Sequence, residues 1–199
     1  MTLDTLRPIW PEPVLTGRYS VRTRRRDGAA QSLSTSFAVL NGGVSSGVAK
    51  QQFLVTVDGE PRLVVMKQGG IKVYSAGPAP VLVLRDLGQR RYEVVDHNLD
   101  TVIGSLHVTG GFTRPARSTI LDPDGRTAGE LVQPPAALVG RWLLVGLDRY
   151  TIEVDGSRVA QARERRRMFA MEVEVDVSEL AGRLDPRLVL AAVLQRMAY

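Results

Sequence analysis

Hydrophobic and polar residues alternate along much of this chain. Between residues 168 and 177 four apolar side chains fall on one face and three acidic side chains on the other: Met171, Val173, Val175 and Val177 against Glu172, Glu174 and Asp176. A period of two is that of a half-buried β-strand. Similar short runs, rich in β-branched and aromatic residues, occur at 53–57, 63–67, 71–74, 81–84, 92–95, 102–108, 118–121, 142–145 and 150–154. Their spacing of about 8 to 12 residues is typical of an all-β sandwich or barrel.

Turn signals connect these runs. Asp-Gly pairs occur at 27–28, 58–59, 124–125 and 155–156, and such a pair supplies the positive φ angles that a tight hairpin requires. Four segments have the pattern strand, acidic turn, strand: 53–66, 92–106, 118–131 and 150–162. The sequence therefore predicts a meander of about ten or more antiparallel strands.

One segment, residues 186–199, has the pattern of a helix. It follows Asp185, a good N-cap, and begins with Pro186, which suits the first helical position. The seven residues 188–194 are all apolar, and that many consecutive positions cover every side of a helix. Such a helix requires burial all round. The pattern fits a position inside a closed sheet, and it equally fits a position on an outer face, such as a dimer interface.

Two segments lack these patterns. Residues 1–16 contain Pro8, Pro11 and Pro13 and are predicted to form an extended N-terminal arm. Residues 41–50 are rich in glycine and serine and are predicted to form a loop. Strand patterns resume directly after each proline-rich connection, so residues 17–199 are predicted to form one domain.

Composition narrows the function classes. The chain has no cysteine, which excludes disulfides, thiolate metal sites and a cysteine nucleophile. Its net charge of +5 comes from 26 Lys and Arg residues, nearly all of them arginine, and this excess is too small to predict a nucleic-acid partner. The N-terminus lacks a signal-peptide pattern, and the longest apolar runs fall far short of the ~20 residues that span a bilayer. A cytoplasmic protein without a transmembrane span, with peripheral membrane attachment as an option, is predicted.

Three groups of residues carry a family resemblance. They are 92–96 with 102–106, 120–125 with Gly129, and 168–194, which together combine acidic hairpins, an alternating strand and an Asp-led apolar helix. In these features the chain resembles the tubby-like superfamily, which includes LURP-one-related proteins and phospholipid scramblases. The resemblance implies a closed antiparallel barrel of about twelve strands around a central apolar helix. Members of the superfamily bind phosphoinositides, are linked to lipid movement or have no assigned activity, so the resemblance implies binding of an anionic phospholipid headgroup without implying a reaction.

Arginine clusters are the strongest candidates for a binding site. The candidates for contacting an anionic headgroup are Arg163, Arg165, Arg166 and Arg167, with Arg22 and Arg24 in a second cluster. Alternate arginines on a strand point the same way and can hold phosphate bidentately. In the competing interpretation of residues 163–167, a hairpin sets this basic stripe against the acidic face of 168–177, and cross-strand ion pairs occupy the charges. For the second cluster, beside the Asp27-Gly28 turn, the competing interpretation is a solvated turn.

Catalytic motifs are absent from the sequence. His97 and His107 are the only histidines, and two histidines without a spaced third ligand do not specify a metal site. Residues 122–125 lack the ligand spacing of a calcium loop. We therefore predict a non-enzymatic binding protein without a cofactor or metal, whose ligand is an anionic lipid headgroup. The alternative is a protein–protein adaptor or a structural component of a complex. A barrel filled by its own helix would bind its ligand outside or at the rim.

Overall fold

The computed structural model describes residues 10, 12–23, 51–67, 69–75, 79–110, 117–133, 147–167, 170–180 and 182–198. Twelve strands lie within these residues: β1 (Arg18–Thr23), β2 (Gln51–Val57), β3 (Glu60–Lys67), β4 (Ile71–Tyr74), β5 (Pro80–Asp86), β6 (Arg91–Asp96), β7 (Thr101–Thr109), β8 (Arg117–Leu121), β9 (Thr127–Val132), β10 (Leu147–Val154), β11 (Ser157–Arg167) and β12 (Ala170–Asp176). The helices in the same part of the chain are α1 (Glu12–Thr16) and α4 (Pro186–Ala198).

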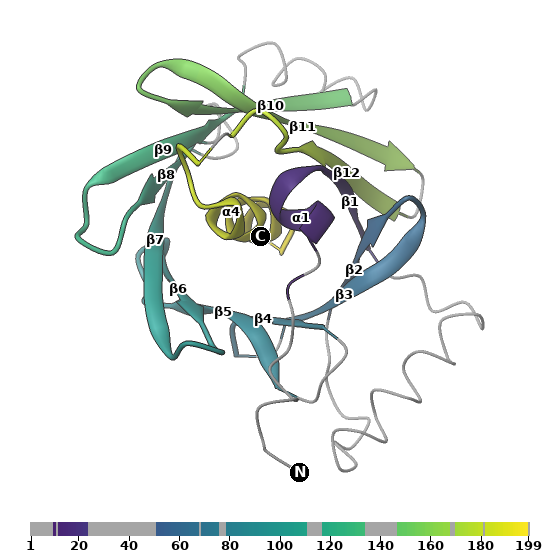
Figure 1. Ribbon diagram of the computed structural model, residues 1–199, viewed down its shortest axis with the longest axis horizontal. Coiled ribbons are helices and arrows are strands. Elements are labelled where there is room, and N and C mark those ends of the chain that lie inside the picture. Colours follow the sequence, from purple (N-terminus) through teal and green to yellow (C-terminus); the bar gives the residue numbers. More distant parts are fainter. Residues whose placement is uncertain are drawn as a thin grey trace.

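The strands form a closed antiparallel barrel. Each strand from β2 to β12 pairs with its neighbours in sequence, and β1 closes the barrel by pairing with both β12 and β2. The ring of strands is visible in Figure 1, which looks along the shortest axis of the molecule. The predicted all-β fold is therefore confirmed, and of the two architectures that the strand spacing allowed, the barrel is the one observed.

Most predicted strands agree with the observed ones to within a few residues, while the run at 142–145 lies outside the described residues. The predicted hairpin turns at Asp58-Gly59 and Asp155-Gly156 have positive φ angles at both positions. The Asp-Gly pair at 27–28 and the loop at 41–50 also lie outside the described residues. The meander follows from short strands joined by tight turns.

Apolar side chains at alternate positions of the strands form the core. Buried examples from each strand are Val21, Phe53, Leu63, Ile71, Leu84, Tyr92, Leu106, Ile120, Leu131, Ile152, Ala162 and Val173. On β12 the predicted division holds, with Val173 and Val175 buried and the acidic side chains more exposed. The period of two along each strand thus separates the core from the outer face.

The predicted C-terminal helix is present as α4. Asp185 caps it, since the backbone N–H of Arg187 donates to Asp185 Oδ1 at 2.9 Å. Ten of its 13 residues are buried, among them Leu188, Leu190 and Leu194. Burial on every side follows from its uniform apolarity, because an exposed face would leave leucine or valine in water.

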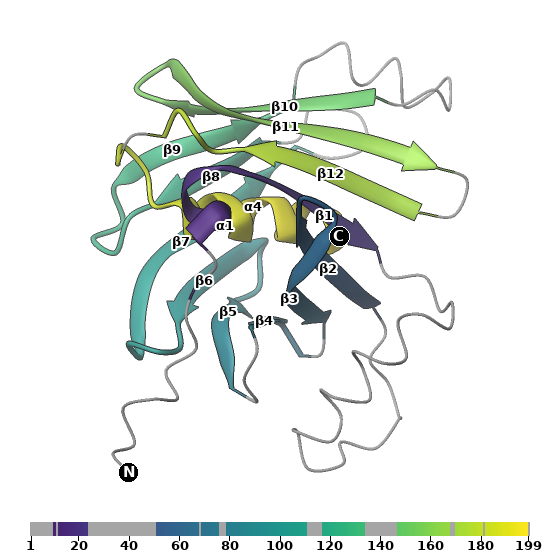
Figure 2. The same cartoon turned by 45° about the vertical axis from the view of Figure 1, so that its right-hand side comes forward.

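Contacts from several strands hold α4. It packs against β7 and β8. At its C-terminal end Lys67 Nζ of β3 donates to the carbonyl oxygen of Ala198 at 2.6 Å, and near its start Arg187 forms an ion pair with Asp96 of β6. In Figures 1 and 2, which differ by a 45° turn, strands are drawn on more than one side of the helix.

Gly104 of β7 permits the close approach of α4. A Cβ atom at this position would lie 2.3 Å from the carbonyl oxygen of Leu121 and 3.0 Å from the side chain of Leu188. Both contacts are shorter than van der Waals distance. A glycine is therefore required where the first turn of the helix meets β7.

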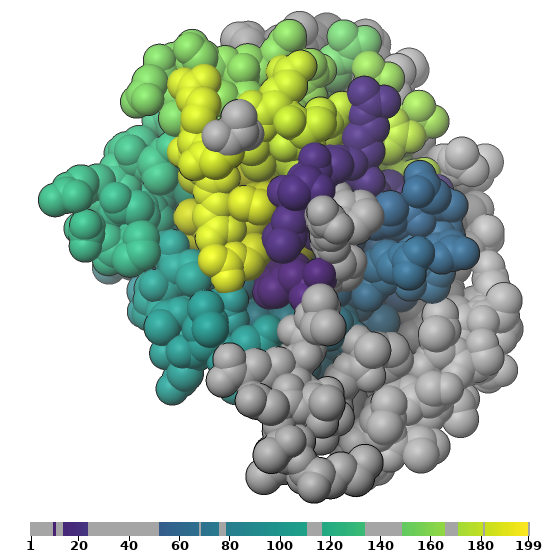
Figure 3. All heavy atoms as spheres, in the orientation of Figure 1, coloured from purple at the N-terminus to yellow at the C-terminus, as the bar shows by residue number. Residues whose placement is uncertain are grey.

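The expected extended arm of residues 1–16 requires a correction at its end, while residues 1–9 and 11 lie outside the described part of the structure. Residues Glu12–Thr16 form the short helix α1, and Val14 of this helix is fully buried. α1 packs against α4 and β1, and Figure 3 shows these N-terminal residues in purple beside the yellow C-terminal part. The prolines suggested an extended conformation, but Pro13 lies in the first turn of α1, where proline needs no N–H partner.

Candidate functional site

Cross-strand ion pairs occupy all three acidic side chains of β12. Strand β12 lies between β1 and β11. Arg18 Nε lies 2.6 Å from Asp176 and Arg22 Nε lies 2.5 Å from Glu172 on the β1 side. On the β11 side, Arg165 Nη2 lies 3.3 Å from Glu174. The interpretation as a cross-strand charge ladder therefore holds for Arg165. Arg22, for which the sequence suggested a solvated turn, forms an ion pair of the same kind on β1.

Of the other four predicted arginines, only Arg163 has a side chain that the structure describes. Arg163 is exposed on β11, and its cross-strand partner Glu174 has its ion pair with Arg165 instead. The side chains of Arg166 and Arg167, and all of Arg24, lie outside the described part of the structure. Of the predicted site residues whose side chains are described, only Arg163 lacks an ion pair within that part.

Arg149 joins Arg163 at this surface, although the sequence did not single it out. Arg149 of β10 is the direct cross-strand partner of Arg163. Both side chains are exposed, and within the described residues neither has a carboxylate within ion-pair distance. Like charges directly opposite one another on neighbouring strands repel. An anion placed between them would remove that repulsion and accept hydrogen bonds from both guanidinium groups.

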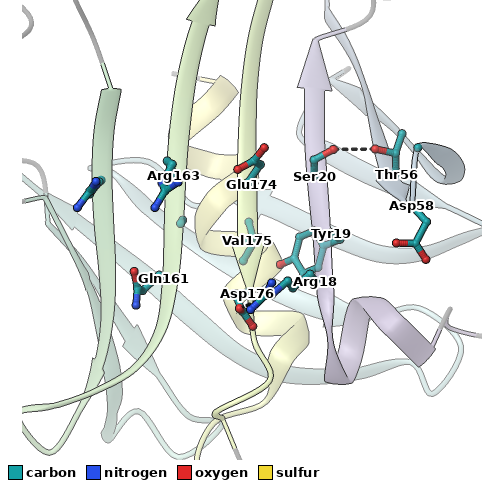
Figure 4. Close-up of a pocket in the computed structure, with 13 residues that line it drawn as sticks. Arg18, Tyr19, Ser20, Thr56, Asp58, Gln161, Arg163, Glu174, Val175 and Asp176 are labelled. Atoms are coloured by element: carbon teal, nitrogen blue, oxygen red, sulfur yellow. Dashed lines mark hydrogen bonds and ion pairs between the residues drawn. The ribbon is translucent and has the colours of Figure 1, made fainter.

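The arginine pair lies in a shallow groove on the outer face of the barrel. Figure 4 shows this groove crossing β11, β12, β1 and β2, with Arg163, Glu174, Ser20 and Thr56 at one level. The groove has a volume of about 460 Å³. Its side-chain lining includes Arg18, Ser20, Thr56, Asp58, Arg149, Gln161, Arg163, Glu174 and Asp176.

Register explains why these side chains share one row. Arg149 pairs with Arg163, Arg163 with Glu174, Glu174 with Ser20, and Ser20 with Thr56. The Ser20 and Thr56 hydroxyl groups are 2.7 Å apart and share a hydrogen bond. The row thus begins with two cations, continues with a carboxylate and ends with two hydroxyl groups.

A second polar cluster is buried where α4 meets β10 and β11. The Tyr150 hydroxyl donates to Glu164 Oε2 at 2.8 Å and accepts from Arg196 Nε of α4 at 3.2 Å. The Arg196 guanidinium also lies 5.6 Å from the centroid of the Tyr150 ring. Glu164 is only 2% exposed, so these contacts offset the cost of burying its charge. The cluster connects α4 to β10 and β11.

The described residues contain no group of three or more histidine, cysteine or acidic side chains that could hold a metal ion. His97 is exposed in the turn after β6, whereas His107 is on β7, so the two lie apart along the chain and in different elements. Among the described helices, none is both long enough and apolar enough to cross a bilayer.

Comparisons with models of protein families, with curated proteins and with solved structures give no match to this chain. The functional argument therefore rests on the outer groove and on the charges along it.

Proposed function

We propose that this protein is a non-enzymatic binding protein of the tubby-like type that holds an anionic phospholipid headgroup on the outer face of its barrel. The observation that carries the proposal is that Arg149 and Arg163 lie opposite each other and that neither forms an ion pair within the described residues. Two adjacent guanidinium groups match a phosphate, which accepts several charge-assisted hydrogen bonds. With this ligand, the protein would be cytoplasmic and would attach peripherally to a membrane surface.

The architecture supports the tubby-like part of the proposal. A closed barrel of twelve strands with a buried C-terminal helix has the shape that the resemblance implies. The proposal also includes that α4 lies in the interior of the barrel and that its side chains fill this interior. The contacts of α4 with β3, β6, β7 and β10 support this position. A filled interior leaves the outer face as the place for a ligand.

Cysteine labelling tests the position of the helix. The chain has no cysteine of its own, so a single introduced thiol reports one site. Ala191 is fully buried, and Ala191→Cys should react with a polar maleimide only after unfolding. Thr127→Cys, at an exposed position, is the matched control and should react in the native protein. Rapid native labelling at position 191 would contradict an interior helix.

Vesicle flotation tests the ligand. The full chain should float with phosphatidylcholine vesicles that contain an anionic phospholipid and stay unbound with phosphatidylcholine alone. Binding should weaken as salt rises, because exposed charge interactions are screened over about 10 Å at 0.1 M salt. The double variant Arg149→Ala, Arg163→Ala should bind at least about tenfold more weakly, which is the effect of losing about 1.4 kcal/mol.

Arg158→Ala is the control for net charge. Arg158 is exposed on the same strand as Arg163 but does not line the groove. Its substitution removes one positive charge and should leave binding within about twofold of wild type, since a distant exposed charge contributes little. Equal loss in this control, or no binding to anionic vesicles at low salt, would contradict the proposal.

The adaptor alternative has less support in the described structure. An adaptor would be expected to have an unpaired edge strand or an exposed apolar patch near the N-terminal 50 residues, of which the structure describes only 10 and 12–23. Every one of the twelve described strands has a partner on both sides. Within the same residues the large exposed hydrophobic side chains are Leu87, Leu99 and Val102, none of which lies in that region. The arginine pair therefore makes the lipid headgroup the preferred ligand.

A further inference from the structure

The outer groove is bipolar, and its acidic side adjoins the arginine pair directly. Glu174 of β12 is the cross-strand partner of Arg163, and Figure 4 shows the two side chains on neighbouring strands at one level. The Glu174 side chain is 41% exposed, and its ion pair to Arg165 at 3.3 Å involves Oε2. The carboxylate therefore faces solvent beside the place where an anion would sit.

A phosphate midway between Arg149 and Arg163 would lie about one and a half strand spacings, ~7 Å, from this carboxylate. At that distance two negative charges repel each other unless a cation lies between or beside them. The Arg165 ion pair with Glu174 offsets part of this repulsion, and a headgroup with a phosphate alone leaves the rest in place. A headgroup with an ammonium group next to its phosphate replaces it with attraction.

We infer that the groove selects an anionic headgroup of the phosphoserine kind, which carries a primary ammonium group two carbons away from its phosphate ester. The inference rests on the proposed function and specifies which class of headgroup the groove binds. The phosphate lies between Arg149 and Arg163, and the ammonium group lies at Glu174. A two-carbon linker separates phosphate and ammonium by about the distance between neighbouring strands.

The rest of the groove agrees with this polarity. Beyond Glu174 the row continues with Ser20 and Thr56, whose hydroxyl groups are bonded to each other. The groove then reaches Asp58, an exposed acidic residue in the turn between β2 and β3. Arg18 and Asp176 offset each other as an ion pair, so positive charge lies at the β10–β11 end and the charge left at the β12–β2 end is negative. A ligand with one charge only would complement half of this surface.

Two vesicle compositions of equal net charge test the inference. Phosphatidylserine and phosphatidylglycerol each contribute one negative charge, but only phosphatidylserine has an ammonium group. In flotation assays the full chain should bind phosphatidylserine vesicles about tenfold or more tightly than phosphatidylglycerol vesicles, which corresponds to at least one charge-assisted contact. Equal binding to both would overturn the inference and leave the proposed function standing. Binding to neither would overturn both.

The variant Glu174→Gln tests whether Glu174 causes the preference for phosphatidylserine. This variant should bind both vesicles about equally, because the amide cannot attract ammonium or repel phosphate. The matched control is Glu172→Gln on the same strand, which also loses an ion pair with an arginine but does not line the groove. The control should keep the preference for phosphatidylserine. Loss of preference in the control, or its retention in Glu174→Gln, would overturn the role of Glu174.

Competition by a soluble ligand distinguishes a lipid headgroup from a free metabolite as the natural ligand of the groove. The probe is O-phosphoserine, which has the same charged groups without the acyl chains. At millimolar concentration it should compete with phosphatidylserine vesicles, and inorganic phosphate should compete more weakly. Capture of O-phosphoserine together with failure to bind any vesicle would overturn the lipid source.

Discussion

Tyr150 and Glu164 lie on neighbouring strands and share a buried hydrogen bond of 2.8 Å, in which the tyrosine hydroxyl donates to the carboxylate. Tyr150→Phe should lower the free energy of unfolding by about 1–3 kcal/mol, because it removes a donor to a buried charged group and a contact of Arg196. Urea denaturation followed by far-UV circular dichroism measures this change.

Tyr19→Phe is a matched control for that variant. Tyr19 of β1 is also a buried tyrosine of the barrel, but its hydroxyl has no hydrogen-bond partner in the described structure. Removing a buried hydroxyl without a partner should be neutral or slightly stabilising. A loss of stability in Tyr19→Phe equal to that in Tyr150→Phe would show that the hydrogen bond is not the cause.

Gly104→Ala should destabilise the barrel. The new methyl group would lie 2.3 Å from the carbonyl oxygen of Leu121 and press on Leu188 of α4, and such overpacking costs about 1–3 kcal/mol. Gly59→Ala is the control. Gly59 also has a positive φ, but a Cβ there meets nothing within 4 Å, so it adds backbone strain without the collision. Thermal unfolding should show a clearly larger decrease in Tm for Gly104→Ala.

The ion pair between Asp96 and Arg187 connects the start of α4 to strand β6. Asp96 is 2% exposed, and its Oδ1 accepts the backbone N–H groups of Asn98 and Leu99. Hydrogen bonds to Asp185, and then the charge of Asp96, raise the pKa of the Arg187 guanidinium against the opposing effect of burial. Arg187 therefore stays charged, and Asp96→Asn should weaken the fold by about 1–3 kcal/mol because it removes one partner of a buried charge.

A surface pair gives the comparison for that prediction. Arg62 and Glu60 are 2.8 Å apart, with side chains 50% and 70% exposed. Arg62→Ala should change the free energy of unfolding by less than about 1 kcal/mol, as is usual for exposed ion pairs. Similar losses in Arg62→Ala and Asp96→Asn in urea denaturation would contradict the role assigned to burial.

The sequence predicted those features of the fold that depend on local pattern. Alternation identified β12 and its two faces, Asp-Gly pairs identified hairpins, and uniform apolarity of residues 188–194 predicted a helix buried on all sides. The helix α1 was missed because it is only five residues long and its burial depends on α4 and β1. Closure of the barrel also depends on a long-range pairing, between β1 and β12.

The sequence identified Arg163 but not Arg149 as a site residue, because a β-bulge determines that the two arginines lie opposite each other. A regular hairpin around the turn Asp155-Gly156 would place Arg149 opposite Ala162, with the arginines out of line. The register shifts between Ile152 and Glu153 and brings Arg149 opposite Arg163. Val159 and Ala160 are consecutive and both buried, which is the local sign of the extra residue. Two adjacent apolar residues after the turn were the available signal.

The ion pair between Asp176 and Arg18 predicts a dependence of stability on pH. Burial alone would raise the pKa of Asp176, but the hydrogen bonds from Ser178 and Arg18 and the charge of Arg18 outweigh it, so the pKa is lowered. A carboxyl with a lowered pKa in the folded state stabilises the protein above the pKa of the unfolded chain. This contribution is lost as pH falls through the folded-state pKa.

The loss should therefore occur mainly below about pH 4, where an unperturbed aspartate is half protonated or more. Asp176→Asn should be less stable than wild type at pH 7, and the difference should shrink as pH falls below 4. Urea denaturation at a series of pH values measures both curves. Asp124→Asn, in the exposed turn between β8 and β9, is the control and should follow wild type at every pH. A difference between Asp176→Asn and wild type that stays constant from pH 7 to pH 3 would show that the Asp176 carboxylate does not stabilise the fold through its charge.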